Sequence, residues 1–205
     1  SGQVRVDGGR AKPDRKLKLG EEVRIPPVRI AERQEIRPPD EVLNRLREAI
    51  RHEDRDYLIL DKPEGLAAHG GSGLAFGVIE AIRAWHRYEY IELAHRLDRD
   101  TSGLLLLAKN REALLRAQRA FSQGKAQKRY LALLCGDWRG GARDVDAPIG
   151  KTGEGSDQRV TARADGKASL SRFTPLQVFR EGVLCEVDIF SGRTHQIRVH
   201  AGMLG

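Results

Sequence analysis

The sequence predicts an α+β fold built on a largely antiparallel sheet. Many short apolar runs of strand length follow one another along the chain, and only three segments carry helical periodicity. Strands that run together between sparse helices are typical of this fold class. The 205 residues, 40% of them hydrophobic, suffice for one sizeable core with a small appendage.

The appendage is expected at the N-terminus. Residues 1–25 carry the short extended runs VRVDG and EEVRIP, separated by glycine, proline and a KLKLG turn, and they are too few to bury a core. Residues 26–40 begin and end with Pro-Pro pairs, which stiffen a chain toward an extended linker. We therefore expect the main domain over 41–205.

Apolar periodicity predicts the elements of this domain in order. Helices are expected over 41–50, over 75–87 and after Asn110. Strands are expected over 56–63, 102–109, 128–136, 158–164, 169–179 and 182–190. Asn110 is a suitable N-cap for the third helix, whose apolar face is Leu114, Ala117 and Phe121, and Gly124 stops it.

The composition favours a polyanionic partner. The chain has 36 Lys and Arg against 29 Asp and Glu, a net charge of +7 and a sequence pI near 9.7, an excess that attracts phosphate backbones. Cys135 and Cys185 form no CxxC pair, which predicts a reducing cytosol and no zinc cluster. No apolar run approaches the roughly 20 residues of a membrane span.

Several catalytic classes fail on their motifs. The glycine-rich Gly70–Gly77 stretch lacks the GK[ST] of a nucleotide-binding loop, so it is either a flexible loop or a simpler phosphate cradle. Val145 stands where a loop ending in GKT at 150–152 needs its first glycine. A serine hydrolase elbow requires Gly-x-Ser-x-Gly, and around Ser72 the last glycine of this motif is replaced by Leu74. His195 and His200 lack partners at metal spacing, so structural or RNA-contacting roles are expected for them.

The stretch AHRLDRDTSGLLLLAKN, residues 94–110, crowds charges against a segment that looks like a buried strand. A solvated turn explains this composition. Alternatively, basic neighbours hold a carboxylate at the edge of a rigid strand for chemistry. Candidates for this chemistry are then Asp98, Tyr130, Arg193 and Arg198. Each also has a non-catalytic interpretation: Asp98 as a surface carboxylate, Tyr130 as a half-buried strand tyrosine, and the arginines as a solvated basic helix end.

Three motifs resemble those of a known family. HRLDRDTSG at 95–103, KRYLA at 128–132 and GRTHQIRVH at 192–200 are similar, in order and separation, to the motifs of the bacterial RluA-type pseudouridine synthases. DKPEGLAAHGG at 61–71 resembles the segment that precedes them. VRIPPVRIAER and HGGSGLAFGVIEAIR most resemble the RluC branch, which modifies large-subunit (23S) ribosomal RNA, and residues 1–25 resemble the second half of an S4 RNA-binding module.

The resemblance implies a role for each candidate. Asp98 would be the catalytic carboxylate, Arg198 its cationic partner, and Tyr130 the ring that stacks on the target base and a candidate for removing the C5 proton. Arg96 would fill the gap left by the extruded nucleotide, on the same side of an extended strand as Asp98. The remaining RNA contacts would come from Arg99, Arg193 and His195. Asp61, Lys62 and Pro63 are expected to be structural, with RNA contact as the alternative.

The same resemblance implies a cytoplasmic, monomeric enzyme that acts on ribosomal RNA without cofactor, metal or membrane. The chain starts at Ser1-Gly2 and stops at Gly205, so we expect it to lack the start of the S4-like module and the segment after the third motif. Two rival functions stay open. A non-catalytic ribosome-associated RNA binder would share the charge, and a glycosidase-like hydrolase would use a carboxylate at C1′ but needs a second acid.

Overall fold

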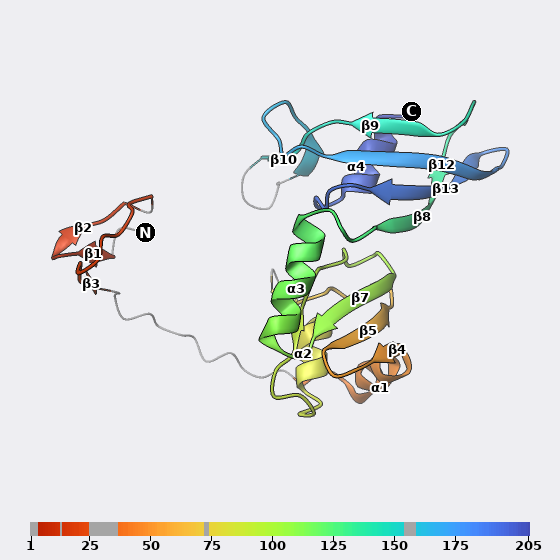
Figure 1. The fold of residues 1–205 in the computed structure, drawn as a ribbon. Coiled ribbons are helices and arrows are strands. Elements are labelled where there is room, and N and C mark those ends of the chain that lie inside the picture. Colours follow the sequence, from red (N-terminus) through yellow and green to blue (C-terminus); the bar gives the residue numbers. More distant parts are fainter. Residues whose placement is uncertain (1–3, 13, 25–36, 72–73, 154–158) are drawn as a thin grey trace. The chain divides into compact units, whose positions relative to one another are not determined.

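The computed structural model describes residues 4–12, 14–24, 37–71, 74–153 and 159–205 (Figure 1). It consists of two compact units, residues 1–36 and residues 37–205, which are described separately. Most of the proline-rich linker predicted for 26–40 lies outside the described residues.

The first unit contains a small antiparallel sheet in the order β2-β1-β3, formed by β1 (Arg5–Val6), β2 (Gly9–Arg10) and β3 (Val23–Arg24). Asp7 and Gly8 both have positive φ, 48° and 77°, which is the geometry of the tight hairpin turn that Asp-Gly favours. The Asp7 carboxylate accepts the Glu22 N–H at 2.9 Å, so it joins this turn to the start of β3. Only Val6 is a buried hydrophobic residue among the described residues of this unit.

The second unit contains a first antiparallel sheet in the order β4-β5-β7-β6. Its strands are β4 (Ile50–Glu53), β5 (Tyr57–Lys62), β6 (Glu92–Leu93) and β7 (Gly103–Ala108). Strand alternation turns Leu58, Leu60, Leu105 and Leu107 to one face. The helices α1 (Asp40–Glu48) and α2 (Val78–Arg83) complete this core with Leu43, Leu46, Val78 and Ile82.

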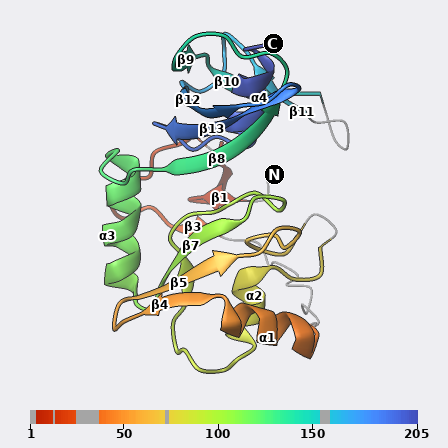
Figure 2. The same cartoon turned by 90° about the vertical axis from the view of Figure 1, so that its right-hand side faces the viewer.

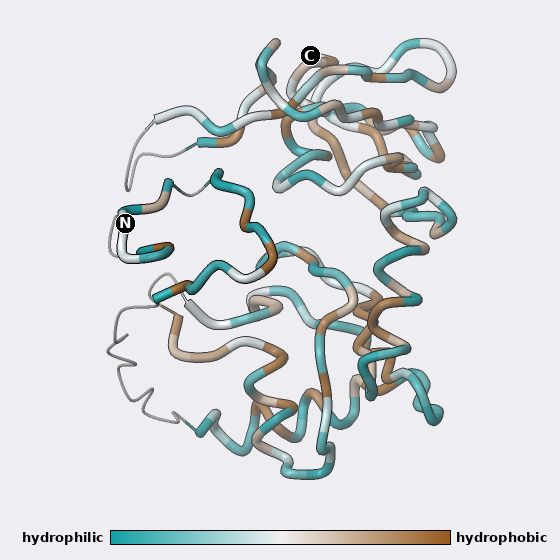
Figure 3. Tube along the Cα trace, turned by 60° about the vertical axis from the view of Figure 1, so that its left-hand side comes forward, coloured by the Kyte–Doolittle hydropathy of each residue, from teal (hydrophilic) through white to brown (hydrophobic). Residues whose placement is uncertain are grey.

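A second antiparallel sheet has the order β8-β13-β12-β9 and is connected to the first by α3 (Arg111–Ser122) (Figure 2). Its strands are β8 (Arg129–Cys135), β9 (Arg143–Asp146), β12 (Leu170–Val178) and β13 (Gly182–Ile189). A hairpin, β10 (Ile149–Thr152) with β11 (Arg159–Ala162), lies between β9 and β12 in sequence. The final helix, α4 (Gln196–Gly202), packs Ile197 and Ala201 on the core of this sheet. Hydrophobic residues concentrate in the strands and the helices beside them (Figure 3).

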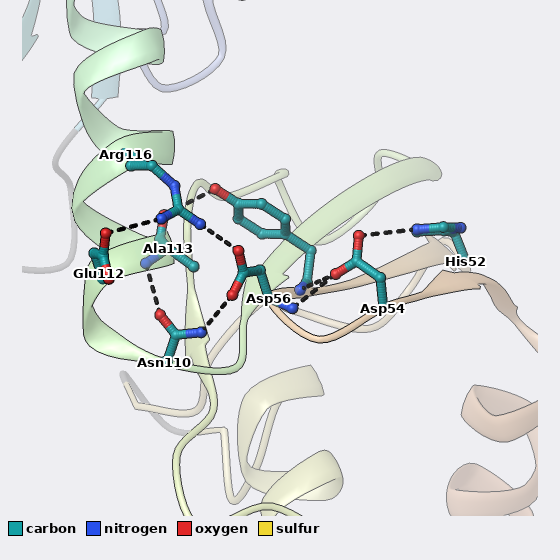
Figure 4. A network of polar contacts seen from close by, with 8 residues as sticks. His52, Asp54, Asp56, Asn110, Glu112, Ala113 and Arg116 are labelled. Atoms are coloured by element: carbon teal, nitrogen blue, oxygen red, sulfur yellow. Dashed lines mark hydrogen bonds and ion pairs between the residues drawn. The ribbon is translucent and has the colours of Figure 1, made fainter.

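A network of polar contacts holds the β4–β5 turn to the start of α3 (Figure 4). Asp56 accepts hydrogen bonds from Asn110 Nδ2 at 2.8 Å and from Arg116, while Asn110 Oδ1 caps α3 by accepting the Ala113 N–H at 2.8 Å. The predicted N-cap role of Asn110 is therefore confirmed. The Tyr57 hydroxyl adds a bond to the Ala113 carbonyl at 3.1 Å.

Two expectations about elements need correction. The helix predicted over 75–87 is shorter, Val78–Arg83, because a Cβ at Gly77 would lie 2.5 Å from the His69 carbonyl carbon and Glu80 turns back to accept the Gly77 N–H. The strand predicted as buried over 102–109 is buried on one face only, since Leu104 is 64% exposed.

Candidate functional site

Three segments that are far apart in the sequence line one hollow of the second unit. They are residues 96–101 before β7, the start of β8, and residues 189–198 around the start of α4. The hollow brings together six of the seven predicted site residues: Arg96, Asp98, Tyr130, Arg193, His195 and Arg198. Arg99 is not among the lining residues.

Asp98 stands in a turn directly before β7. The Thr101 N–H donates to the Asp98 carbonyl at 3.1 Å, and Gly103 enters the strand with φ of 120°, a backbone conformation that favours glycine. Leu97, only 6% exposed, is buried in the first core, whereas Arg96 on one side is exposed and the Asp98 side chain on the other is 27% exposed. Residues 96–98 do not form the strand that the sequence prediction assumed, but Arg96 and Asp98 line the same hollow.

The Asp98 carboxylate faces His195. Oδ2 accepts the His195 backbone N–H at 3.3 Å and lies 3.9 Å from Nε2 of the same residue. His195 has φ of 54°, a left-handed conformation that histidine tolerates better than most side chains. A non-glycine residue with this backbone in a functional hollow indicates that the surrounding structure enforces it.

Buried polar contacts fix the helix that begins after His195. Gln196 donates from Nε2 to the Leu170 carbonyl and to Ser171 Oγ, both at 3.0 Å. His200 is fully buried, with Nδ1 2.9 Å from Ser171 Oγ and Nε2 3.0 Å from the Ala147 carbonyl. Because a carbonyl only accepts, Nε2 carries the proton and Nδ1 accepts from the serine. His200 is therefore structural, one of the two roles expected for it.

Tyr130 lies on the inner face of β8, where it packs against both hydrophobic cores of the second unit. Burial raises the pKa of its hydroxyl, and the negative charge of Asp98 raises it further. The ring is therefore neutral at physiological pH, and it presents an aromatic surface to the hollow beside Asp98.

Two lysines beside the site bind carbonyl groups, Lys62 from a fully buried position and Lys128 from a partly buried one. Lys62, fully buried at the end of β5, donates to the carbonyls of Pro63, Leu66 and Arg99 at 2.8, 2.7 and 3.1 Å. Burial lowers the pKa of Lys62, against the opposing charges of Asp100, Glu64 and Asp98. Its bond to Arg99 ties the Asp98 turn to the strand.

Lys128, which precedes β8, donates to the Ser191 carbonyl at 2.7 Å and so joins the second motif to the residue directly before the third. Burial lowers the pKa of Lys128, and the nearby positive charge of Arg193 lowers it further. Sequence reasoning assigned no role to this lysine. Its place beside the tyrosine in QKRYLAL was the available signal.

The arginine expected to neutralise Asp98 has a different partner. Arg198 Nη2 lies 3.9 Å from Asp100 Oδ2, and no ion pair joins Arg198 to Asp98 among the described residues. Arg99 pairs with the neighbouring Asp100 at 3.7 Å. Arg193 donates from Nε and Nη2 to the Ala168 carbonyl, both at 3.3 Å.

No group of three or more His, Cys, Asp or Glu side chains in the described residues is placed to hold a metal ion. None of their helices has the length and apolar character to cross a membrane.

Comparison with known proteins identifies relatives of the chain. The sequence profile of the RNA pseudouridylate synthase family matches residues 56–202. The chain is 45% identical over 208 residues to proteins of Vibrio parahaemolyticus and Escherichia coli K12, both named ribosomal large subunit pseudouridine synthase C. These alignments cover all of this chain and 65% of each relative's length, so the chain spans less than two thirds of those proteins.

Solved structures show the same fold. The human RNA pseudouridylate synthase domain-containing protein 4 superposes with a TM-score of 0.66 at 22% identity, over 80% of this chain and 67% of that one. The human RNA pseudouridylate synthase domain-containing protein 1 superposes with a TM-score of 0.62 at 27% identity, over 77% of this chain and 65% of that one. The family profile spans all three segments that line the hollow. Together these findings show that the chain belongs to the RNA pseudouridylate synthase family.

Proposed function

We propose that this chain is an RNA pseudouridine synthase that isomerises uridines of large-subunit ribosomal RNA, with Asp98 as the essential carboxylate. One observation carries the proposal: Asp98 opens into a hollow that it shares with Tyr130, His195 and Arg198, which come from separate segments of a chain in this family. The relatives' printed name supports the choice of RNA.

The reaction needs no redox partner, because it is an isomerisation. The bond from ribose C1′ to uracil N1 breaks, a bond from C1′ to C5 forms, the proton on C5 leaves and N1 gains a proton. An ionised Asp98 supplies the negative charge, either by attacking C1′ or by acting on the ring. Asp98 requires cationic or hydrogen-bonding neighbours in a partly dry site. His195 supplies the backbone N–H at 3.3 Å, and Arg198 lines the same hollow.

The target base must leave its stack before it can enter the hollow, at a cost of a few kcal/mol that is smallest in RNA loops. We assign the stacking role to Tyr130 and the gap-filling role to Arg96, which is exposed beside Asp98. The raised pKa of Tyr130 favours the stacking role over removal of the C5 proton at neutral pH. Arg99, Arg193 and His195 would complete the RNA contacts.

The remaining expectations follow from the same proposal. Residues 1–25 would belong to an S4-like RNA-binding module, and 26–40 would link it to the catalytic domain over 41–205. The enzyme would act in the cytoplasm as a monomer, without cofactor or metal.

The decisive variant is Asp98→Asn, which keeps the side chain's size while it removes the charge and most of the nucleophilicity. We expect the variant to fold, to bind RNA nearly as well as the unmodified chain, and to release no tritium from RNA that carries C5-tritiated uridine. Tritium release is the correct measurement because forming the new carbon–carbon bond expels that hydrogen.

A matched control is Asp146→Asn on β9, an exposed carboxylate outside the hollow, which should release tritium normally. Release by Asp98→Asn near the unmodified rate, from protein free of host synthase, would overturn the mechanism. RNA binding without tritium release by the unmodified chain would point instead to the non-catalytic RNA binder.

A further inference from the structure

His95 stands where the chain leaves the edge of the first sheet. Continued by one residue beyond the pair Leu93–Leu107, the register of β6 against β7 brings Ala94 opposite Leu106. The Ala94 N–H donates to the Leu106 carbonyl at 3.0 Å, as in an ordinary antiparallel pair. Such a pair normally exchanges two backbone bonds. Here the return bond differs, because the Leu106 N–H donates to Nε2 of the His95 imidazole at 3.1 Å.

The imidazole therefore replaces a backbone acceptor directly beyond the last pair of the β6–β7 ladder, Leu93 with Leu107. The replacement lets the chain turn away from the sheet after Ala94 without leaving the Leu106 amide unpaired. An amide left without an acceptor at this partly buried position is unfavourable, so the bond fixes where the strand ends. Asp98 follows only three residues later.

The surroundings of the ring favour its neutral form. His95 packs against Phe121 of α3, with ring centroids 4.9 Å apart. Burial lowers the pKa of His95, the positive charge of Lys128 lowers it further, and the backbone of Arg96 opposes both. The groups that contact the ring from β7 and α3, the Leu106 amide and the Phe121 ring, are uncharged. A nitrogen that accepts an N–H carries no proton, so the proton of the neutral ring is on Nδ1.

Two further anchors hold the segment between His95 and β7. Leu97 is buried in the first core, and the Arg99 carbonyl accepts from the buried Lys62. The side chains of His95 and Leu97 and the carbonyl of Arg99 therefore fix the backbone on both sides of Asp98. Without the hydrogen bond of His95, only the Leu97 side chain and the Arg99 carbonyl would hold the backbone around Asp98.

We propose that His95 is a positioning residue for Asp98, and that it acts as an uncharged hydrogen-bond acceptor for the Leu106 amide. The proposal rests on the catalytic role of Asp98 given above. His95 does not touch the substrate in this proposal; it sets the point where the chain departs from β7 and hence where the carboxylate stands.

A pH dependence follows from the acceptor role. The pKa of His95 in the folded chain is below its ordinary value of 6.5. As the pH falls from 6.5 toward the folded value, the unfolded chain gains a proton that the folded chain does not, so the stability of the folded chain decreases. Below the folded value the ring itself is protonated, Leu106 loses its acceptor, and Asp98 loses its first anchor.

Two substitutions separate the acceptor from the ring. His95→Gln keeps an oxygen acceptor at about the reach of Nε2 that cannot be protonated, whereas His95→Leu keeps an apolar contact with Phe121 and removes the acceptor. The matched control is His52→Gln, which changes an exposed histidine of β4 paired with Asp54 at 3.2 Å, outside the hollow.

The activity probe is a large-subunit ribosomal RNA transcript with C5-tritiated uridine. We expect His95→Leu to lower kcat by on the order of 10- to 100-fold with KM little changed, since small misplacements of a catalytic group cost that much. His95→Gln should restore most of kcat and should keep its activity at acidic pH better than the unmodified chain. His52→Gln should follow the unmodified chain throughout.

A second measurement does not depend on activity. Amide hydrogen exchange at Leu106 should be slow in the unmodified chain and in His95→Gln, and fast in His95→Leu. The carboxyl carbon resonance of Asp98 should shift in His95→Leu but not in His95→Gln.

An unchanged kcat in His95→Leu, despite fast exchange at Leu106, would overturn the positioning role. Equal losses of kcat in both variants, with slow exchange retained in His95→Gln, would overturn it as well. If the unmodified chain releases no tritium, the proposed function fails. In that case the Leu106 exchange and the Asp98 resonance still decide the inference about His95.

Discussion

Tyr130 joins the catalytic chemistry to the packing of the second unit. Its ring contacts both cores, so a large part of its side chain is fixed before any RNA arrives. Its raised pKa, caused first by burial and then by the charge of Asp98, keeps the hydroxyl protonated. A rigid neutral ring is suited to stacking, which is worth about 1–3 kcal/mol per base.

Tyr130→Phe therefore tests which part of the side chain matters. If the ring stacks on the base, Tyr130→Phe should retain most of kcat, and Tyr130→Leu should lose both affinity for the flipped base and kcat. Tritium release across pH 6–9 is the measurement, with RNA binding as the control. If Tyr130→Phe instead abolishes release while RNA binding is intact, the hydroxyl is the group that removes the C5 proton.

At the scale of elements, β5 contributes to the site through its last residue. Lys62 is fully buried, and its ammonium binds three carbonyls, of which the Arg99 carbonyl belongs to the Asp98 turn. Lys62→Met should lower the free energy of unfolding by about 1–3 kcal/mol, because buried acceptors lose their donor. It should also lower kcat, because the turn loses an anchor.

The control for this prediction is Lys109→Met, which removes a lysine bound to Glu53 at 2.9 Å and to the Asp54 carbonyl, outside the hollow. Both variants should unfold at lower denaturant concentration, and only Lys62→Met should reduce kcat. Equal effects of the two variants on kcat would mean that Lys62 contributes stability alone.

Elements with strong apolar periodicity could be predicted from the sequence, and those that bury polar groups could not. The strands β5, β7, β8, β12 and β13 follow apolar runs, and α1 and α3 present apolar faces. In contrast, α4 buries Gln196 and His200, so its pattern of buried residues is polar and gives no hydrophobic period. The short strands β4 and β9 have mostly exposed or half-exposed side chains, so their hydrophobic pattern is also too weak to predict them.

The candidate site shows a similar division. The motifs named six of the lining residues, because each motif carries unusual charges at a strand or helix end. Ion-pair partners depend on side-chain directions that spacing does not define, so the contact of Arg198 with Asp100 was not foreseen. The supporting roles of His95 and Lys128 depend on bonds to distant backbone groups, Leu106 and Ser191, which the sequence does not reveal.

At the scale of the whole molecule, the charge of +7 matters only where cations lack acidic partners. Arg172 forms two hydrogen bonds of 2.7 Å with Asp144, so its charge is neutralised within the protein. Arg193 instead lies in the hollow, contacts a carbonyl, and lowers the pKa of Lys128 by repulsion. A phosphate bound beside Arg193 and Lys128 would relieve that repulsion.

RNA affinity should therefore fall steeply with salt, through release of counterions from the phosphates, over about 50 to 200 mM. Arg193→Ala should reduce the slope of log affinity against log salt by about 1, the change expected when one phosphate contact is lost. Arg172→Ala should leave the slope unchanged, because it removes a charge that Asp144 already balances. Filter binding of a ribosomal RNA transcript to the three proteins measures these slopes.

Equal slopes for the unmodified chain and Arg193→Ala would show that Arg193 binds the Ala168 carbonyl without contacting RNA. An affinity that does not change with salt in all three proteins would exclude the basic hollow as the RNA interface.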